Sequence, residues 1–389
     1  MRLLFISDFT EQFPYRLLRG IMNYSRHTGQ VWEVCKIPPS FKREIGLRRF
    51  VKWAVKWRAD AVIGQFDPDD KVSVFRKHGI AAMAQDYIST FDEIPNITAD
   101  YALTGAMAAE RFFGHGFKNF AFFGYNGVCW SDGRLEGFRS RIKEENLENR
   151  LYIYDRQQIN RLWDYDRPDL RHWLLTLPKP IGIFACDDNQ AGILMEACHV
   201  AGINVPMDVA VIGVDNDEVT CNLISPAITS IEMDIERAGI EVAEMLSHMV
   251  EDKEFKGEDV VIKPVSVIGR ASTGMIATKD EVVAKAIKFI YDNRERKITV
   301  SDVLGQVPVS RRLLEHRFRE VTGTSIYNMI SILRIEYFAH QLISSNDTIS
   351  EIAAKMDEPD AKGISRRFKE IKGCTPSQYR ARELRKSSS

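Results

Sequence analysis

The sequence of 389 residues lacks several patterns that mark common classes of protein. Its six cysteines form no C-x-x-C pair and have no histidine at ligand spacing, which argues against a disulfide framework and a zinc site. No run of about twenty apolar residues is present, so we expect no membrane span. The short apolar run Leu3 to Ile6 ends at Ser7 and Asp8, which predicts a buried strand and no signal peptide. We therefore expect reduced thiols and a cytoplasmic location.

Motifs for nucleotide or hydrolase chemistry are missing as well. The chain has no G-x-x-x-x-G-K-[ST] loop, no Gly-x-Gly-x-x-Gly after its first predicted strand, and no G-x-S-x-G elbow. We therefore expect a protein that is not an enzyme and that holds no metal and no cofactor.

The composition supports large folded domains with an uneven charge. A hydrophobic content of 44% in 389 residues is enough for two or three domains with their own cores. The net charge is −1, but residues 279–389 carry 21 Lys and Arg against 15 Asp and Glu, whereas residues 1–278 carry 32 against 39. The last third is therefore at +6 and the rest at −7. This distribution favours a phosphate-binding part attached to an acidic body.

Two helix-turn-helix patterns lie in tandem within residues 277–386, at 299–321 and 349–371. One stripe of each second helix is predicted to face inward and anchor the helix: Leu313, Leu314, Arg317 and Phe318 in the first, and Ile364, Phe368 and Ile371 in the second. The opposite stripes can enter a major groove, where Arg can bond guanine and Glu can accept from cytosine. These candidate DNA contacts are Arg311, Arg312, Glu315 and His316, followed by Lys362, Ser365, Arg366 and Lys369.

This region resembles the AraC family of transcription regulators. The likeness rests on the close of the second pattern, which contains Phe368, Lys369, Gly373, Thr375, Pro376, Tyr379 and Arg380. Two departures stand out: Asp357-Glu358-Pro359 replaces the family's glycine-aromatic turn, and Gly363-Ile364 replaces its aromatic pair. Because a glycine within a helix costs roughly 1 kcal/mol against alanine, the second unit is expected to contribute mainly phosphate contacts, which position without specifying sequence.

Residues 1–276 alternate strand-like runs with amphipathic helical stretches, which predicts two α/β lobes with parallel sheets and ligands at the strands' carboxyl ends. The chain is expected to cross between lobes near 99–102, 229–233 and 259–265, and residues 387–389 are expected to form a disordered tail. The predicted strands are 3–7, 61–64, 81–84, 120–124, 182–186, 209–214 and 260–267, and the predicted helices include 15–27, 103–114, 134–145, 189–201 and 236–251.

The same region resembles the effector domain of LacI and GalR-type repressors, which is similar to periplasmic binding proteins. Arg134, Gly137 and Phe138 match that family's Arg-x-x-Gly-aromatic segment, in which the resemblance implies an arginine bonded to the effector. Residues 185–192, ACDDNQAG, match its Ala-x-Asn-Asp-x-x-Ala-x-Gly segment, with Asp187 in place of asparagine. Residues 211–215, VIGVD, match a strand that ends in an effector-binding aspartate.

These residues suit a sugar, because adjacent hydroxyls pair with carboxylates and a planar arginine while an aromatic ring covers the apolar face. The candidate effector-binding residues are Asp8, Phe9, Asp67, Trp130, Arg134, Asp187 and Asp215. Structural roles remain open for several: Asp8 or Asp188 as a helix cap, Phe9 or Trp130 as packing, and Arg134 as partner of a structural carboxylate.

The order of the two parts resembles the XylR-type family of xylose-responsive activators, a likeness that includes Phe66-Asp67 and the spacing from Trp130 to Arg134. It implies a transcription factor that binds D-xylose or a related pentose. We expect a homodimer formed through the effector domain, which binds an operator on double-stranded DNA, activates sugar-utilisation genes and, as an activator, works with RNA polymerase. The alternative is a sugar-binding or sugar-processing protein whose C-terminal helices serve assembly, with Asp187 and Asp215 as a glycosidase pair.

Overall fold

The computed structural model describes the chain except for residues 155–167, 275–277, 279, 346, 359–360 and 382–389. Two compact units are present: Met1–Gly114 with Lys118–Thr273, and Gly274–Ser389 with His115–Phe117. The predicted tail at 387–389 and most of the connection at 274–280 lie outside the described residues.

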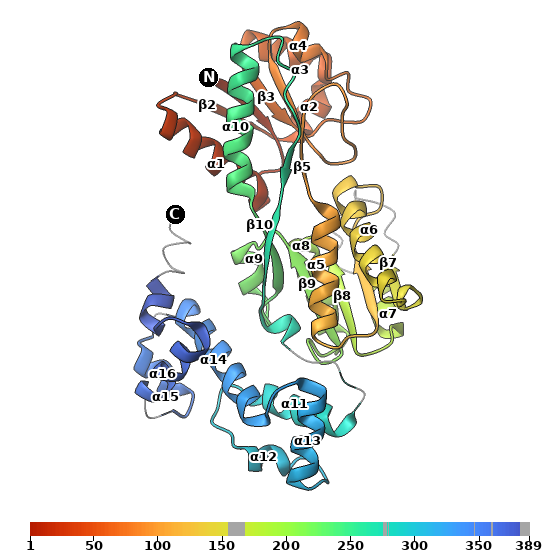
Figure 1. The fold of residues 1–389 in the computed structure, drawn as a ribbon. Helices are drawn as coiled ribbons and strands as arrows, with labels where there is room; N and C mark the ends of the chain where they lie inside the picture. The colour runs from red at the N-terminus through yellow and green to blue at the C-terminus, as the bar shows by residue number, and fades with distance from the viewer. Residues whose placement is uncertain (155–167, 275–277, 279, 346, 359–360, 382–389) are drawn as a thin grey trace. The chain divides into compact units, whose positions relative to one another are not determined.

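The first unit contains two sheets, each with six strands among the described residues, and helices pack against both (Figure 1). In the first lobe every strand pair is parallel, in the order β11-β5-β4-β3-β1-β2. The strands are β1 (Arg2–Ile6), β2 (Glu33–Ile37), β3 (Ala61–Gly64), β4 (Ala81–Gln85), β5 (Asn96–Ala99) and β11 (Val260–Ile262). The helices are α1 (Gln12–Thr28), α2 (Pro39–Ile45), α3 (Leu47–Lys56), α4 (Val74–Lys77) and α10 (Ile235–Glu251).

The second lobe has the order β12-β10-β9-β8-β6-β7, parallel except that β12 runs antiparallel to β10. Its strands are β6 (Phe120–Phe123), β7 (Leu151–Tyr154), β8 (Ile181–Ala185), β9 (Val209–Val214), β10 (Thr229–Met233) and β12 (Pro264–Ile268). Its helices are α5 (Tyr101–Gly114), α6 (Cys129–Glu144), α7 (Pro168–Thr176), α8 (Asp188–Val200) and α9 (Glu218–Leu223). The predicted two-lobed α/β fold is confirmed.

Three chain segments connect the lobes. The predicted single strand at 260–267 was wrong: it is two strands in different sheets, because the chain passes from one lobe to the other at Lys263. The Asp100 amide donates to Ile262 O at 3.0 Å, the Asp234 amide donates to Lys263 O at 3.0 Å, and Lys263 Nζ lies 3.2 Å from Asp100 Oδ2. The three connections are therefore bonded to one another and form one hinge.

The second unit is helical in its described residues: α11 (Glu281–Asp292), α12 (Val300–Leu304), α13 (Arg311–Thr322), α14 (Ile326–Ser344), α15 (Ile349–Lys355) and α16 (Ala361–Lys372). The predicted cores are confirmed at Phe318 and Phe368, which are fully buried. Leu313 was wrongly placed inward: it is 45% exposed, because Leu314 and Phe318 set the buried side of α13. Within the described residues, none of the helices combines the length and apolar character that a membrane crossing requires.

Candidate ligand cavity and DNA-binding surface

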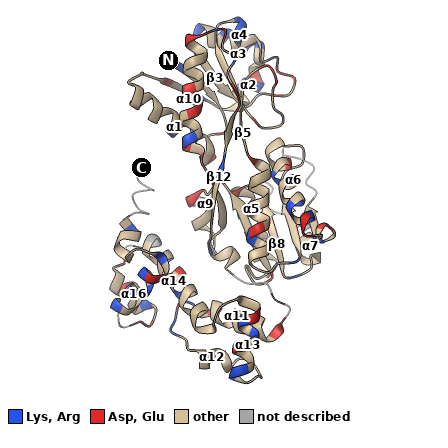
Figure 2. Ribbon diagram, viewed as in Figure 1, with Lys and Arg blue, Asp and Glu red and all other residues tan. Residues whose placement is uncertain are grey.

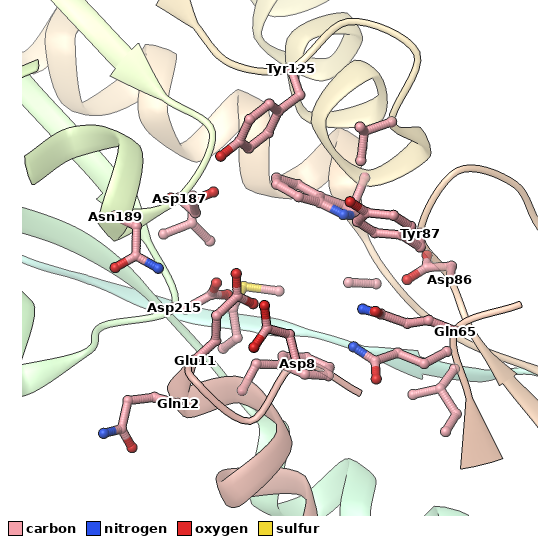
Figure 3. A pocket seen from close by; sticks show the side chains of 18 of the residues that line it. Asp8, Glu11, Gln12, Gln65, Asp86, Tyr87, Tyr125, Asp187, Asn189 and Asp215 are labelled. Carbon is pink, nitrogen blue, oxygen red and sulfur yellow. The ribbon is translucent and has the colours of Figure 1, made fainter. Parts of the chain in front are cut away.

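A cavity of about 340 Å³ lies at the carboxyl ends of the strands of both lobes (Figure 3). Loops after β1, β3 and β4 line it on one side, and loops after β6, β8 and β9 on the other. Ala99, Met233 and Ile262, next to the hinge, complete the wall. Ligand sites span about 300 to 1,000 Å³, so this cavity suits a small molecule.

Five of the seven predicted effector residues line the cavity: Asp8, Trp130, Arg134, Asp187 and Asp215. Asp8 does not cap a helix, because its Oδ1 accepts from the amide and hydroxyl of Thr10 at 2.9 and 2.7 Å in a tight turn before α1.

Phe9 and Asp67 are not among the lining residues. The Phe9 ring packs edge-on against Phe5 and Tyr15, at centroid distances of 5.3 and 5.6 Å. Asp67 lies 2.6 Å from Nζ of the buried Lys42, which also pairs with Asp70. Lys42 is the buried residue of α2, whose Pro39, Ser40 and Arg43 line the cavity. Asp67 therefore holds the wall in place and does not itself form it.

Close helix packing places Arg134 at the cavity. A Cβ atom on Gly137 of α6 would lie 2.3 Å from Ala102 O, and one on Gly105 of α5 would lie 2.3 Å from Arg134 O. The backbones of α5 and α6 approach so closely that only glycine fits at these two positions. The glycine of the Arg-x-x-Gly-aromatic segment thus fixes the helix that carries the arginine.

The Arg134 guanidinium is 6% exposed and bonded within the cavity wall. Its Nη1 donates to Cys186 O, and its Nη2 lies 3.4 Å from Asp215 Oδ1. The guanidinium carbon lies 5.3 Å from the Trp130 ring centroid. Burial lowers the pKa of this group, but Asp215 and other negative neighbours raise it above its ordinary value. The buried Nε has no hydrogen-bond partner among the described residues, so this donor has unused capacity.

Asp187 begins the helix after β8. Its Oδ1 accepts from the Gln190 amide at 2.6 Å, so Asp187 is the N-cap of α8 and the suggested cap at Asp188 is off by one residue. Asp188 is buried instead and accepts from the Asp217 amide at 2.8 Å. Burial raises the pKa of Asp187, aided by Asp215 and opposed by the Gln190 amide and Arg134. The substitution of aspartate for the family's asparagine thus keeps the capping role and adds an acidic group.

Asp215 and Asn216 form a left-handed turn after β9, with φ of 94° and 49°. Residues other than glycine rarely adopt such angles, at a cost of about 1 to 3 kcal/mol each, unless their surroundings hold them. Here Arg16 Nη1 donates to Asp215 O at 2.8 Å, and the Asn216 amide donates to Ser230 Oγ at 3.0 Å. The turn places Asp215 Oδ1 3.4 Å from Arg134 Nη2.

Glu11 is a cavity residue that the sequence analysis missed. It precedes α1 without capping it, and Figure 3 places its carboxyl beside Asp8 and Asp215. The residue is exposed as a whole, but the protein around its carboxyl group displaces water and so disfavours the charged form. This desolvation raises the pKa of Glu11 to about 8, and the negative charges of Asp187, Asp8 and Asp215 contribute further. No motif marked this position; its spacing of three residues from Asp8, at the same strand end, was the available signal.

The cavity lining is strongly acidic. Seven carboxyl groups face two guanidinium groups, which favours a neutral ligand with many hydroxyls over an anion, because hydroxyls donate to carboxylates and accept from arginine. The carboxyl groups belong to Asp8, Glu11, Asp86, Asp187, Asp188, Asp215 and Asp217, and the guanidinium groups to Arg43 and Arg134. Among the described residues no cluster of His, Cys, Asp and Glu suits a metal ion.

In the second unit, the two helix pairs α12-α13 and α15-α16 begin with side-chain caps. Thr299 and Thr348 each form a capping box, with Asp302 and Glu351, and Ser310 caps α13. Asp357, in the turn between α15 and α16, has a φ of 53°, which aspartate tolerates better than most residues. Asp357 therefore adopts the left-handed conformation that a glycine would favour, without a glycine at that position.

The predicted DNA contacts lie on the exposed sides of α13 and α16, where Figure 2 shows basic residues. Arg311 pairs with Glu315 at 2.9 Å, and His316 lies 3.3 Å from Glu320. Ser365 is half-buried and donates to Ala361 O at 2.7 Å, so its hydroxyl is already engaged. The exposed candidates are Arg311, Arg312, Glu315, His316, Lys362, Arg366 and Lys369.

Comparisons with known proteins agree with both parts. Residues 109–273 match a periplasmic binding protein-like domain, and residues 305–382 match a helix-turn-helix domain. The cavity and the two helix-turn-helix pairs, α12-α13 and α15-α16, together define the class of the protein. It is a ligand-responsive, DNA-binding transcription regulator.

Whole-length relatives narrow this class. The chain is 28% identical to the xylose operon regulatory protein of Escherichia coli strain K12, covering 97% of this chain and 96% of that one. It is 26% identical to the protein of the same name from Haemophilus influenzae, covering 82% and 84%. A solved structure of a xylose-binding transcription activator, xylR, superposes with a TM-score of 0.73 at 26% identity, covering 98% of this chain and 97% of that chain. The predicted likeness to xylose regulators is confirmed.

Proposed function

We propose that this chain is a sugar-responsive transcription activator whose effector is D-xylose or a related pentose. One observation carries the proposal: an acidic cavity of about 340 Å³, large enough for a monosaccharide, lies in the same chain as two capped helix-turn-helix pairs. The similarity to xylose operon regulatory proteins over nearly the whole length supports it. In this proposal residues 1–276 form the sensing domain and residues 277–386 the DNA-binding domain.

In the sensing domain, the sugar lies between the lobes. Arg134 donates to ring hydroxyls from the cavity wall, where its Nη2 makes only a long contact of 3.4 Å to Asp215 Oδ1. Asp8, Asp187 and Asp215 accept from other hydroxyls, and the Trp130 ring covers an apolar face. Phe9 and Asp67 act indirectly, through the packing of α1 and the placement of α2.

In the DNA-binding domain, Arg311, Arg312, Glu315 and His316 read bases in an operator. Lys362, Ser365, Arg366 and Lys369 chiefly contact phosphates. The regulator works in the cytoplasm as a homodimer formed through the sensing domain, recruits RNA polymerase and catalyses no reaction.

The test combines two measurements on the full chain. Calorimetry over a panel of free pentoses identifies the effector, and a gel-shift assay with DNA from the gene's own upstream region detects the operator. We expect D-xylose to bind and to increase the shift of upstream DNA over a scrambled duplex. A chain that binds a pentose, ignores both duplexes and hydrolyses aryl glycosides would favour the sugar-processing alternative.

A further inference from the structure

Three arginines from different parts of the first unit converge on the turn formed by Asp215 and Asn216. Arg134, in the cavity wall, lies 3.4 Å from Asp215 Oδ1. Arg16, on α1 of the first lobe, donates to Asp215 O at 2.8 Å. Arg270, which follows β12, donates from Nη2 to Asn216 Oδ1 at 2.7 Å.

The first lobe has a second connection to this turn. Glu232 of β10 accepts from Arg16 Nη2 at 2.5 Å and from Asn216 Nδ2 at 2.5 Å, so one carboxylate joins the two. Arg16 also donates to both carboxylate oxygens of Glu236 on α10, at 2.9 and 2.8 Å. A movement of α1 relative to the second lobe therefore acts on both residues of the turn.

Arg270 connects the turn to the segment that leaves the first unit. It is followed by the 3-10 helix Ala271–Thr273, and Gly274 begins the second unit. This end segment is tightly held: Ser272 Oγ donates to Val211 O at 2.6 Å, and Thr273 Oγ1 lies 2.8 Å from Thr229 Oγ1. Val211 belongs to β9, the strand that ends at the Asp215 turn. The cavity and the exit of the chain thus share one strand and one turn.

We propose that Arg270 is a positioning residue that transmits effector occupancy from the Asp215-Asn216 turn to the connection with the DNA-binding domain. This inference rests on the proposed function, since it needs an effector that touches Asp215. A bound sugar competes for Arg134 and bonds the Asp215 carboxylate, which shifts a strained turn between two arrangements. Arg270 follows the Asn216 amide and moves the exit segment. A ligand shifts an equilibrium only through contacts that differ between two states. The hydrogen bond from Arg270 to Asn216 is the contact through which the change in the turn reaches the connection to the DNA-binding domain.

The test is a linkage experiment on the full chain with the variant Arg270→Met. Affinity for a labelled duplex from the gene's upstream region is measured by fluorescence anisotropy with and without D-xylose, and D-xylose affinity by calorimetry. In the wild type, D-xylose is expected to change DNA affinity by a factor of about 5 to 150. In Arg270→Met that factor falls to near one, while sugar affinity and sugar-free DNA affinity each stay within about twofold.

Two further variants make the outcome decisive. Arg237→Met removes an exposed arginine of α10 that pairs only locally with Glu241, and it should keep the full factor. Asn216→Gly removes the amide that Arg270 bonds but preserves the left-handed backbone, so it should fold and lose the factor as Arg270→Met does. If both Arg270→Met and Asn216→Gly kept the wild-type effect of D-xylose on DNA affinity, the proposed role of Arg270 would be overturned but the proposed function would stand. A wild type that binds neither D-xylose nor the duplex would overturn the proposed function and the route with it.

Discussion

The two candidate binding surfaces of this chain are built in opposite ways. In the cavity, Arg134 is 6% exposed, Asp187 caps a helix, and Asp215 occupies a strained turn held by Arg16. On α13 and α16, Arg312 and Lys369 are exposed side chains on well-formed helices. A small neutral ligand requires preorganised, desolvated partners, whereas a polyanion is attracted by exposed charge at longer range. Changes in the cavity should therefore be severe and selective, and changes on the helices graded.

The largest effect is expected from Arg134→Ala. Truncating one partner of a buried, hydrogen-bonded charge pair costs about 2 to 5 kcal/mol, and this change leaves Asp215 and Asp187 facing each other without a cation. Sugar binding measured by calorimetry should be abolished, while sugar-free DNA affinity is retained. Arg139→Ala, on the same helix but half-buried and paired with Glu136, is the matched control. An unchanged sugar affinity in Arg134→Ala would remove this residue from the site.

The next effect concerns base recognition by the first helix-turn-helix pair. Arg312 is exposed in the first turn of α13, where a recognition helix meets base edges. Arg312→Ala should cost about 1 to 3 kcal/mol on the operator and relax its sequence preference. Competition binding with operator and random duplexes measures both. Equal losses on the two duplexes would show that Arg312 contacts phosphate only.

The sequence predicted the two surfaces unequally, for physical reasons. The alternating runs predicted both lobes, yet β2, β5, β7 and β10 were missed. β2 and β7 are edge strands with partly exposed residues, and β5 and β10 are interior strands whose sequences, NITA and TSIEM, mix polar residues into the apolar run. Strand-end positions led to Asp8 and Asp215, which follow β1 and β9, because ligands bind at the carboxyl ends of parallel strands, whereas the Arg-x-x-Gly-aromatic segment led to Arg134 on α6.

Tertiary contacts decided the remaining cavity residues. Asp67 follows a strand as Asp8 does, but its carboxylate pairs with Lys42, 25 residues earlier in the chain, and Asp67 is not among the residues that line the cavity. Glu11 entered the cavity because α1 begins at Gln12 and not near Tyr15. On α13, helical periodicity correctly predicted that Leu314 and Phe318 are buried. It could not predict whether Leu313, at the border of the inward-facing stripe, would be buried or exposed.

A pH experiment on Glu11 tests the cavity side of this contrast. The pKa of Glu11 is raised from 4.5 to about 8 in the folded protein, chiefly because burial disfavours the charged carboxylate. A raised folded pKa contributes stability that is complete below the unfolded value of 4.5 and is lost as pH rises through 8. The sugar-free chain should therefore melt at lower temperature at pH 9 than at pH 6.

The variant Glu11→Gln isolates this group from Asp187 and Asp188, whose raised pKa values act in the same direction. Its melting temperature should fall less between pH 6 and pH 9 than that of the wild type. Calorimetric or fluorescence melts in matched buffers provide the comparison. Identical pH dependence in both proteins would mean that Glu11 is ionised in the empty cavity at neutral pH.

The smallest effect is expected from Lys369→Ala. Lys369 is exposed in the last turn of α16, beyond the helix start that enters the groove, so we assign it to a phosphate. Each neutralised phosphate contributes about 0.9 to the slope of log affinity against log salt. Lys369→Ala should therefore weaken operator and random duplexes alike and lower that slope by about one. A loss of affinity confined to the operator, with the salt slope unchanged, would instead show that the second helix-turn-helix pair contacts bases. It would contradict the proposal that α13 contacts bases and α16 chiefly phosphates.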